Sequence, residues 1–167
     1  SLSFPKARTT ITDKLCDAIS THYPDVEVIA GVATAGIPQG ALIAERLGLP
    51  FIYVRSKAKN HGMTNLIEGK VQKGQKCVVI EDLISTGGSS LKAVSDLQNA
   101  EVEVIGMAAI FTYGFDVAKK NFEEANVSLV CLTDYPTMID AAVEANYVKP
   151  EQLENLKKWS ENPSQWG

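Results

Sequence analysis

Short aliphatic runs alternate along this chain with amphipathic segments of helical length, and this alternation limits the fold more than any other feature. The aliphatic runs occupy residues 26–31, 49–55, 76–80, 101–111 and 127–132. The helical segments occupy residues 5–20, 37–48, 89–99, 116–126, 137–146 and 149–162. Gly48 is expected to end the second helix. Alternating strands and helices predict an α/β fold, in which a mostly parallel twisted sheet is flanked by helices.

Length and charge limit the class of protein. The chain has 167 residues, so we expect a single domain over residues 1–167. Its net charge of -4 gives no global attraction to nucleic acid or anionic lipid, so neither partner is expected and any anion site must be local. No apolar run approaches the roughly 18 residues of a membrane span, and the first residues do not resemble a signal peptide.

Three cysteines lie far apart in apolar patterns, without a second ligand at metal-binding spacing. They are Cys16, Cys77 and Cys131. We expect free thiols in a reducing compartment, no metal site made of side chains, and a cytoplasmic location.

The most informative segment is KCVVIEDLISTGGSSLKAV, residues 76–94, in which an aliphatic strand ends at Glu81 and Asp82. The residues that follow supply hydroxyl groups and exposed backbone N–H groups where a helix begins, so they could form an anion cradle. Carboxylates are good acceptors for sugar hydroxyls. Acids beside an anion cradle indicate a ligand with the layout of ribose 5-phosphate. The alternative is a solvated strand end followed by an ordinary turn and helix cap.

Two other phosphate-binding motifs do not fit. Gly69 and Gly74 have the spacing of P-loop glycines, but Gln75 and Lys76 follow them and the segment enters a strand. The chain contains no Gly-x-Gly-x-x-Gly dinucleotide turn. Neither ATP nor NAD is therefore the favoured ligand.

Two further strand ends carry candidate binding groups. The segment RSKAKNHG, residues 55–62, holds four basic side chains within seven positions. These are Arg55, Lys57, Lys59 and His61. Charges this dense repel one another unless an anion joins them, although a solvated loop is the alternative. The segment ATAGIPQG, residues 33–40, could present backbone N–H groups to an anion, or could be a tight turn that needs small residues.

Residues 77–90, CVVIEDLISTGGSS, resemble the phosphoribosyl diphosphate (PRPP) signature of type I phosphoribosyltransferases. The segment RSKAKNHG resembles the mobile catalytic loop of the orotate phosphoribosyltransferases in that family. The resemblance implies that Glu81 and Asp82 hold the ribose hydroxyls. The whole PRPP-binding stretch is then Glu81, Asp82, Leu83, Ile84, Ser85, Thr86, Gly87, Gly88 and Ser89, of which the last five hold the 5′-phosphate.

The same resemblance assigns the diphosphate end of the site. It implies that Arg55, Lys59 and His61 contact the diphosphate, with Lys59 as the main catalytic residue. Ala35 and Gly36 would present backbone N–H groups to the same diphosphate. The role of Lys57 stays open, because family members vary there.

The implied activity is transfer of ribose 5-phosphate from PRPP to orotate, giving orotidine 5′-monophosphate and diphosphate in de novo pyrimidine (UMP) biosynthesis. Mg²⁺ would be bound mainly through PRPP and diphosphate, and a homodimer would share the loop 55–61 across its interface. Two alternatives stay open: a purine-base phosphoribosyltransferase, and a non-enzymatic PRPP-sensing regulator on the same fold.

The chain departs from the family pattern in two places. The family's N-terminal segment, which forms a hood over the base, is expected to be missing. Some members also have an Arg that pairs with the orotate carboxylate, where this chain has Thr112 and Tyr113. Ser85 matches the loop hydroxyl that touches orotate in the family, so base recognition rests on fewer matching residues than phosphate recognition.

Overall fold

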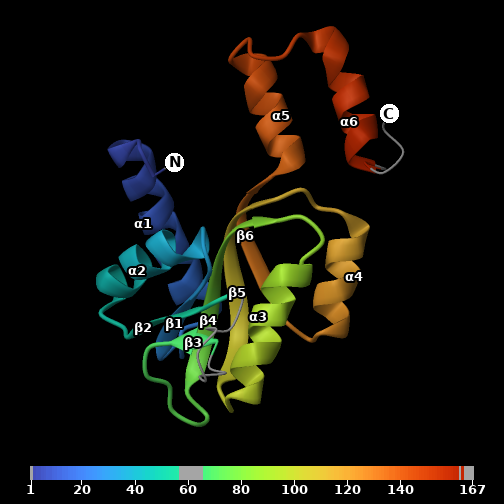
Figure 1. Ribbon diagram of the computed structural model, residues 1–167. Coiled ribbons are helices and arrows are strands. Elements are labelled where there is room, and N and C mark those ends of the chain that lie inside the picture. The colour runs from blue at the N-terminus through green and yellow to red at the C-terminus, as the bar shows by residue number, and fades with distance from the viewer. Residues whose placement is uncertain (1, 57–65, 162, 164–167) are drawn as a thin grey trace.

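The protein is described by a computed structural model that covers residues 2–56, 66–161 and 163 (Figure 1). The strands are β1 (Val28–Val32), β2 (Phe51–Val54), β3 (Ile67–Glu68), β4 (Lys76–Ile84), β5 (Glu103–Thr112) and β6 (Leu129–Asp134). The helices are α1 (Pro5–His22), α2 (Gly36–Leu47), α3 (Gly88–Asn99), α4 (Asp116–Glu124), α5 (Tyr135–Glu144), the 3₁₀ helix η1 (Pro150–Gln152) and α6 (Leu153–Glu161).

The strands form one sheet in the order β3-β2-β1-β4-β5-β6. All neighbouring strands are parallel except β2 and β3, which are antiparallel. The chain moves outward from β1 to β2 and β3, then returns to place β4 on the other side of β1. Ligands of open α/β sheets bind beyond the carboxyl ends of the strands at such a reversal. The topology therefore places a candidate site above β1 and β4.

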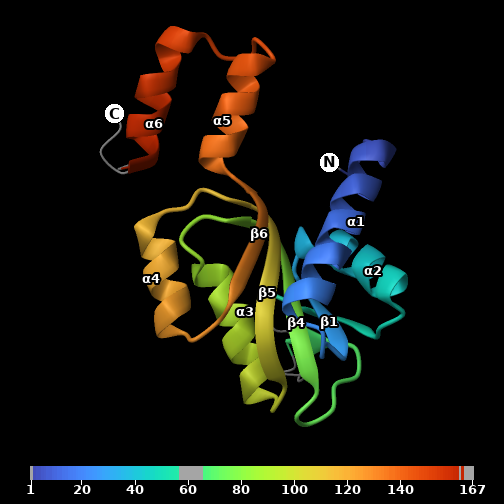
Figure 2. The ribbon, with the colours of Figure 1, turned by 180° about the vertical axis from the view of Figure 1, so that it is seen from behind.

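Helices cover both faces of the sheet. Helices α1 and α2 lie on one face and α3 and α4 on the other (Figures 1 and 2). Leu15, Ile19 and Ile43 pack in the core of the first face, while Leu97 and Phe122 pack in the core of the second. Because β1 is covered on both sides, all five of its residues are buried. The predicted α/β architecture is confirmed.

Three elements differ from the prediction. The strand expected to end at residue 80 continues through Ile84, because β5 still supplies partners, including Ala109 opposite Glu81. Strand β3 was not among the predicted elements, because its two residues are too few to produce a recognisable period. The last helix, expected over residues 149–162, divides into η1 and α6.

The two C-terminal helices form a hairpin beyond the end of β6 (Figure 1). Aromatic rings attach it to the loop after β5: the Trp159 ring centroid lies 5.7 Å from that of Tyr113 and 6.2 Å from that of Phe115. The Tyr113 backbone N–H also donates to the carbonyl of Ile84, 3.0 Å away, at the end of β4. The hairpin is therefore linked to the edge of the candidate site.

Candidate functional site

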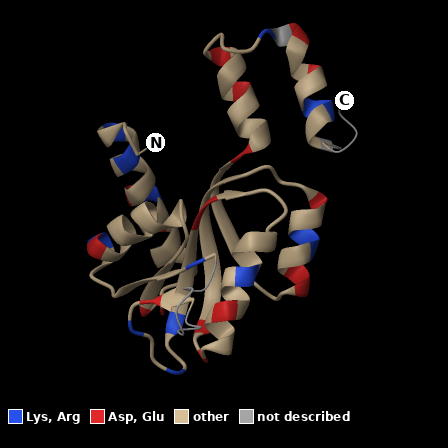
Figure 3. Ribbon diagram, viewed as in Figure 1, with Lys and Arg blue, Asp and Glu red and all other residues tan. Residues whose placement is uncertain are grey.

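Three chain segments meet at the carboxyl ends of the central strands. They are the turn 33–36 after β1, the start of the basic segment after β2, and residues 85–89 between β4 and α3, which we call the phosphate loop. The Ala33 backbone N–H donates to the carbonyl of Val54, the last residue of β2, 2.9 Å away, so the turn 33–36 begins beside the start of the basic segment. In Figure 3 the ribbon of β4 is red, the colour of acidic residues, near its end, where the phosphate loop begins.

Glu81 is a buried carboxylate, with 6% of its surface exposed. Its Oε2 accepts a hydrogen bond of 3.0 Å from the Ser90 hydroxyl on α3, and its Oε1 accepts one of 3.1 Å from the Asp82 backbone N–H. The pKa of Glu81 is raised to about 7, mainly by burial and also by the interaction with Asp82, while the hydrogen bonds from the Asp82 N–H and Ser90 act in the opposite direction. Glu81 is thus held inward, in an environment that favours its neutral form.

Asp82 is the more accessible member of the pair, since its side chain is only half-buried. The charge of Asp82 lies close enough to Glu81 to raise the pKa of that carboxyl group. The two acids are therefore not equivalent. Asp82 can meet a ligand directly, whereas Glu81 is tied to the protein.

The phosphate loop is open to a ligand and depends on one glycine. Gly87 has a φ of +81°, and a Cβ at this position would lie 2.6 Å from Cε2 of Phe122. In the part of the chain that the structure describes, no protein group accepts from the backbone N–H groups of residues 86–88. Thr86, Gly88 and Ser89 are exposed. These N–H groups and the N-terminus of α3 can therefore bind an anion.

The turn 33–36 is pressed against β4. A Cβ on Gly36 would lie 2.3 Å from the carbonyl oxygen of Ile80, and one on Gly31 would lie 2.9 Å from the carbonyl oxygen of Gly36. Only glycine permits this approach. Ala35 is exposed at the start of α2, and no acceptor among the described residues takes the N–H groups of Ala35 or Gly36. The peptide bond between Ala33 and Thr34 is cis.

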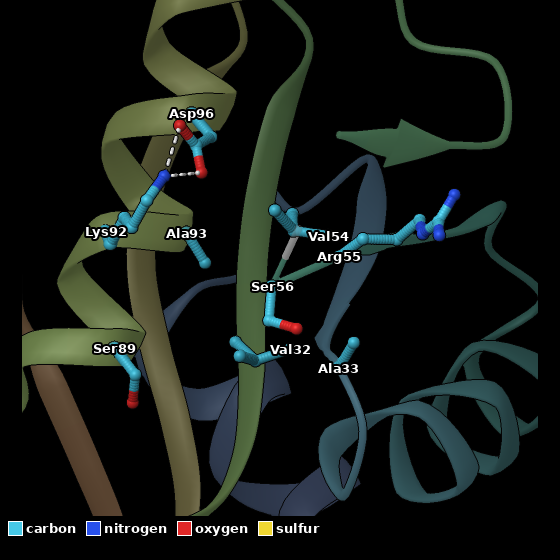
Figure 4. A pocket seen from close by; sticks show the side chains of 9 residues that line it. All are labelled: Val32, Ala33, Val54, Arg55, Ser56, Ser89, Lys92, Ala93 and Asp96. Atoms are coloured by element: carbon cyan, nitrogen blue, oxygen red, sulfur yellow. Dashed lines mark hydrogen bonds and ion pairs between the residues drawn. The ribbon is translucent and has the colours of Figure 1, made fainter. Parts of the chain in front are cut away.

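A pocket of about 180 Å³ lies between the basic segment and α3 (Figure 4). Its lining includes Ser56, Ser89 and the ion pair of Lys92 with Asp96, whose Nζ and Oδ2 are 2.8 Å apart. Arg55 lies on the opposite side, with its guanidinium directed away from that pair. Its Nη1 is 3.4 Å from Oε1 of Glu68 on β3, which holds the first residue of the basic segment against the sheet.

The structure brings most of the predicted residues to one edge of the sheet. The predicted residues from Glu81 to Ser89, with Ala35, Gly36 and Arg55, all lie there, although Ile84 is fully buried and supports the loop from below. Lys57, Lys59 and His61 lie outside the described residues. The sequence placed Ser90 in the anion cradle but did not predict its hydrogen bond to Glu81, and it gave no local signal for Asn121.

Among the residues that the structure describes, no group of three or more His, Cys, Asp or Glu side chains could hold a metal ion. No helix in the described ranges is long and apolar enough to cross a membrane.

Known proteins resemble this chain over its whole length. The model of the phosphoribosyl transferase domain matches residues 8–146. An orotate phosphoribosyltransferase of Cytophaga hutchinsonii is 60% identical over 166 residues, which are 99% of this chain and 79% of that protein. An orotate phosphoribosyltransferase of Listeria innocua is 55% identical over 100% of this chain and 80% of its own length.

Solved structures show the same architecture. The crystal structure of orotate phosphoribosyltransferase from Aeropyrum pernix has a TM-score of 0.77 and 26% identity, over 88% of this chain and 80% of that one. Leishmania donovani UMP synthase has a TM-score of 0.80 over 99% of this chain and 34% of that one, and at 22% identity it supports the fold alone. The buried strand with two acids, the glycine-dependent loop and these likenesses lead to one conclusion: the chain belongs to the phosphoribosyltransferase family, among the orotate phosphoribosyltransferases.

Proposed function

We propose that this protein transfers ribose 5-phosphate from PRPP to orotate, giving orotidine 5′-monophosphate and diphosphate in de novo pyrimidine biosynthesis. The observation that carries the choice of orotate is the 60% identity to a protein of that name over nearly the whole chain. The geometry of β4, the phosphate loop and the turn 33–36 supports PRPP as the common substrate.

Asp82 and the phosphate loop bind the two ends of the ribose 5-phosphate. The half-buried carboxylate of Asp82 accepts hydrogen bonds from ribose hydroxyls, and the open N–H groups of residues 86–88 bind the 5′-phosphate. When ionised, Glu81 offers the ribose hydroxyls the acceptor lone pairs that its hydrogen bonds within the protein leave unused. The hydrogen bond from Ser90 fixes the orientation of its carboxylate. Holding both ends fixes C1′ with respect to the diphosphate and the base.

The bond from C1′ to the diphosphate oxygen breaks with its electron pair leaving on the diphosphate. A ring nitrogen of orotate, after losing its proton, forms the new bond to C1′. The diphosphate gains charge in this step, so cations beside it stabilise the transition state. We assign this role to Arg55, Lys59 and His61, with Lys59 as the catalytic residue and with N–H groups of Ala35 and Gly36 as further donors.

Mg²⁺ fits the site as a cofactor carried mainly by the substrate. The only carboxylates at the end of β4 are the buried Glu81 and the half-buried Asp82, too few to form a cage by themselves. Asp82 is the residue that would hold the metal ion together with the substrate. The ion would supply charge neutralisation of the diphosphate.

Three further properties belong to the proposal. Residues 1–167 act as one phosphoribosyltransferase domain, the protein works in the cytoplasm, and it is a homodimer whose loop 55–61 reaches the neighbouring site. The small-molecule substrates are PRPP and orotate.

A product assay tests the proposal. The protein is supplied with PRPP and Mg²⁺ and with either orotate or hypoxanthine, and the nucleotide formed is measured. We expect orotidine 5′-monophosphate and no inosine monophosphate. Product with hypoxanthine alone would establish the purine-base alternative, and PRPP binding without product from either base would establish the PRPP-sensing alternative.

A further inference from the structure

Helix α4 contacts the phosphate loop at two successive residues, although α4 is about 30 positions away along the chain. The Asn121 side-chain amide donates a hydrogen bond of 2.9 Å to the carbonyl oxygen of Thr86. The next side chain, Phe122, is 4% exposed and lies directly beneath Gly87, where a Cβ would be 2.6 Å from its ring. The loop is therefore supported from the side that faces α4.

The hydrogen bond from Asn121 determines which way one peptide group faces. The Thr86 carbonyl and the Gly87 N–H belong to the same planar peptide, and in a trans peptide they point in opposite directions. Because Asn121 holds the carbonyl toward α4, the Gly87 N–H points away from α4. That N–H has no acceptor among the residues that the structure describes.

Glycine makes this support necessary. Gly87 has a φ of +81° and no side chain, so its peptide groups can rotate more freely than those of any other residue. Phe122 limits the position of the Cα, but an aromatic ring makes no directional bond to a peptide group. Only the Asn121 amide supplies a directional contact to the Thr86 carbonyl among the described residues.

We propose that Asn121 is a positioning residue for PRPP: it orients the peptide group between Thr86 and Gly87 so that the Gly87 N–H is ready for the 5′-phosphate. This inference rests on the proposed function, since it assumes that the phosphate loop binds the phosphate of PRPP. A neutral donor suits this role, because a carboxylate there would repel both the Thr86 carbonyl and the phosphate.

The test compares Asn121→Ala and Asn121→Asp with the parent protein and with Lys120→Ala. Lys120 is exposed on the same helix, and among the described residues its only ion pair is with Glu124, with Nζ and Oε1 3.7 Å apart. Replacing Lys120 with Ala changes the net charge by the same amount as Asn121→Asp. Binding of PRPP is measured by calorimetry, kcat and KM are measured for PRPP and for orotate, and thermal unfolding reports stability.

We expect Asn121→Ala to weaken PRPP binding about tenfold, as the loss of one well-placed hydrogen bond does. Asn121→Asp should be weaker still, with the KM for orotate unchanged in both variants. Lys120→Ala should bind PRPP like the parent. A purely structural role would lower the melting temperature while leaving PRPP binding unchanged well below it, and that result would overturn the inference.

The two proposals fail in different ways. If the parent protein binds PRPP but forms no orotidine 5′-monophosphate, the proposed function fails, and the binding comparison still decides the role of Asn121. If the parent is active and both Asn121 variants bind PRPP as it does, the inference about Asn121 fails alone.

Discussion

Glu81 is a carboxyl group in an environment that favours its neutral form. It is buried at the end of β4, beside a second acid, and only the Ser90 hydroxyl and the Asp82 backbone N–H favour its charge. Burying a carboxyl group costs free energy, so we attribute this acid to ligand binding rather than to folding. Ribose hydroxyls would add the hydrogen bonds that an ionised Glu81 lacks in the protein alone.

The first prediction concerns the pH dependence of stability. The pKa of Glu81 is raised from 4.5 to about 7 by burial, so between these values the folded state keeps a proton that the unfolded chain has released. The free energy of unfolding therefore falls as pH rises through this range, and the loss is complete above pH 7. Relative to Glu81→Gln, which cannot ionise, the parent should lose about 3 kcal/mol between pH 4 and pH 8.

Urea unfolding of both proteins across this pH range measures the difference. The Ser90→Ala variant is the matched comparison, because it removes a donor that favours the charged form and should move the loss to higher pH. A difference between parent and Glu81→Gln that does not change with pH would contradict the assignment.

At the scale of elements, α2 and β4 behave as one unit. The approach of Gly36 to the Ile80 carbonyl places the first turn of α2 against the residue that precedes Glu81. The N–H groups proposed for the diphosphate and the carboxylates proposed for the ribose therefore have a fixed separation. A site that binds both ends of one substrate needs this rigidity.

The second prediction is that Gly36→Ala lowers stability by about 1–3 kcal/mol and raises the KM for PRPP, because the new Cβ pushes α2 away from the backbone of β4. The control is Gly48→Ala at the other end of α2, where φ is +66° and a Cβ would meet nothing within 4 Å. It should lower stability by about 1–2 kcal/mol through backbone strain and leave the KM unchanged. Equal KM values in the two variants would show that α2 does not position the site.

At the scale of the whole molecule, the proposed site contains residues that follow two strands separated by β1 in the sheet. The basic segment follows β2, near one edge, whereas the phosphate loop follows β4 in the middle. A loop that starts at Arg55 can serve the phosphate loop of its own chain or that of a second chain, and the family resemblance favours the second.

The third prediction tests this sharing by mixing two inactive variants, Lys59→Ala and Asp82→Asn, under conditions that allow subunit exchange. If each site takes its basic loop from the partner, half of the sites in a heterodimer are intact, and random mixing restores about one quarter of the parent activity. Each variant alone is the control. A mixture no more active than the two variants measured separately would show that the loop serves its own subunit.

The sequence by itself determined the layers and the position of the site. Aliphatic runs, helical periods and the glycines at positions 36, 48 and 87 are local signals, and they led to the α/β fold and to three strand ends that indeed lie together. These signals work because secondary structure and turn chemistry depend on neighbouring residues.

Only the tertiary structure decided how the site residues are held. The two-residue strand β3 forms because β2 provides a strand to pair with. Glu81 can be buried because α3 packs against the end of β4 and brings the Ser90 hydroxyl within hydrogen-bond distance of its carboxylate. Asn121 meets Thr86 across 35 positions of sequence. Such contacts depend on how separate elements pack, and no periodicity or spacing within one segment carries that information.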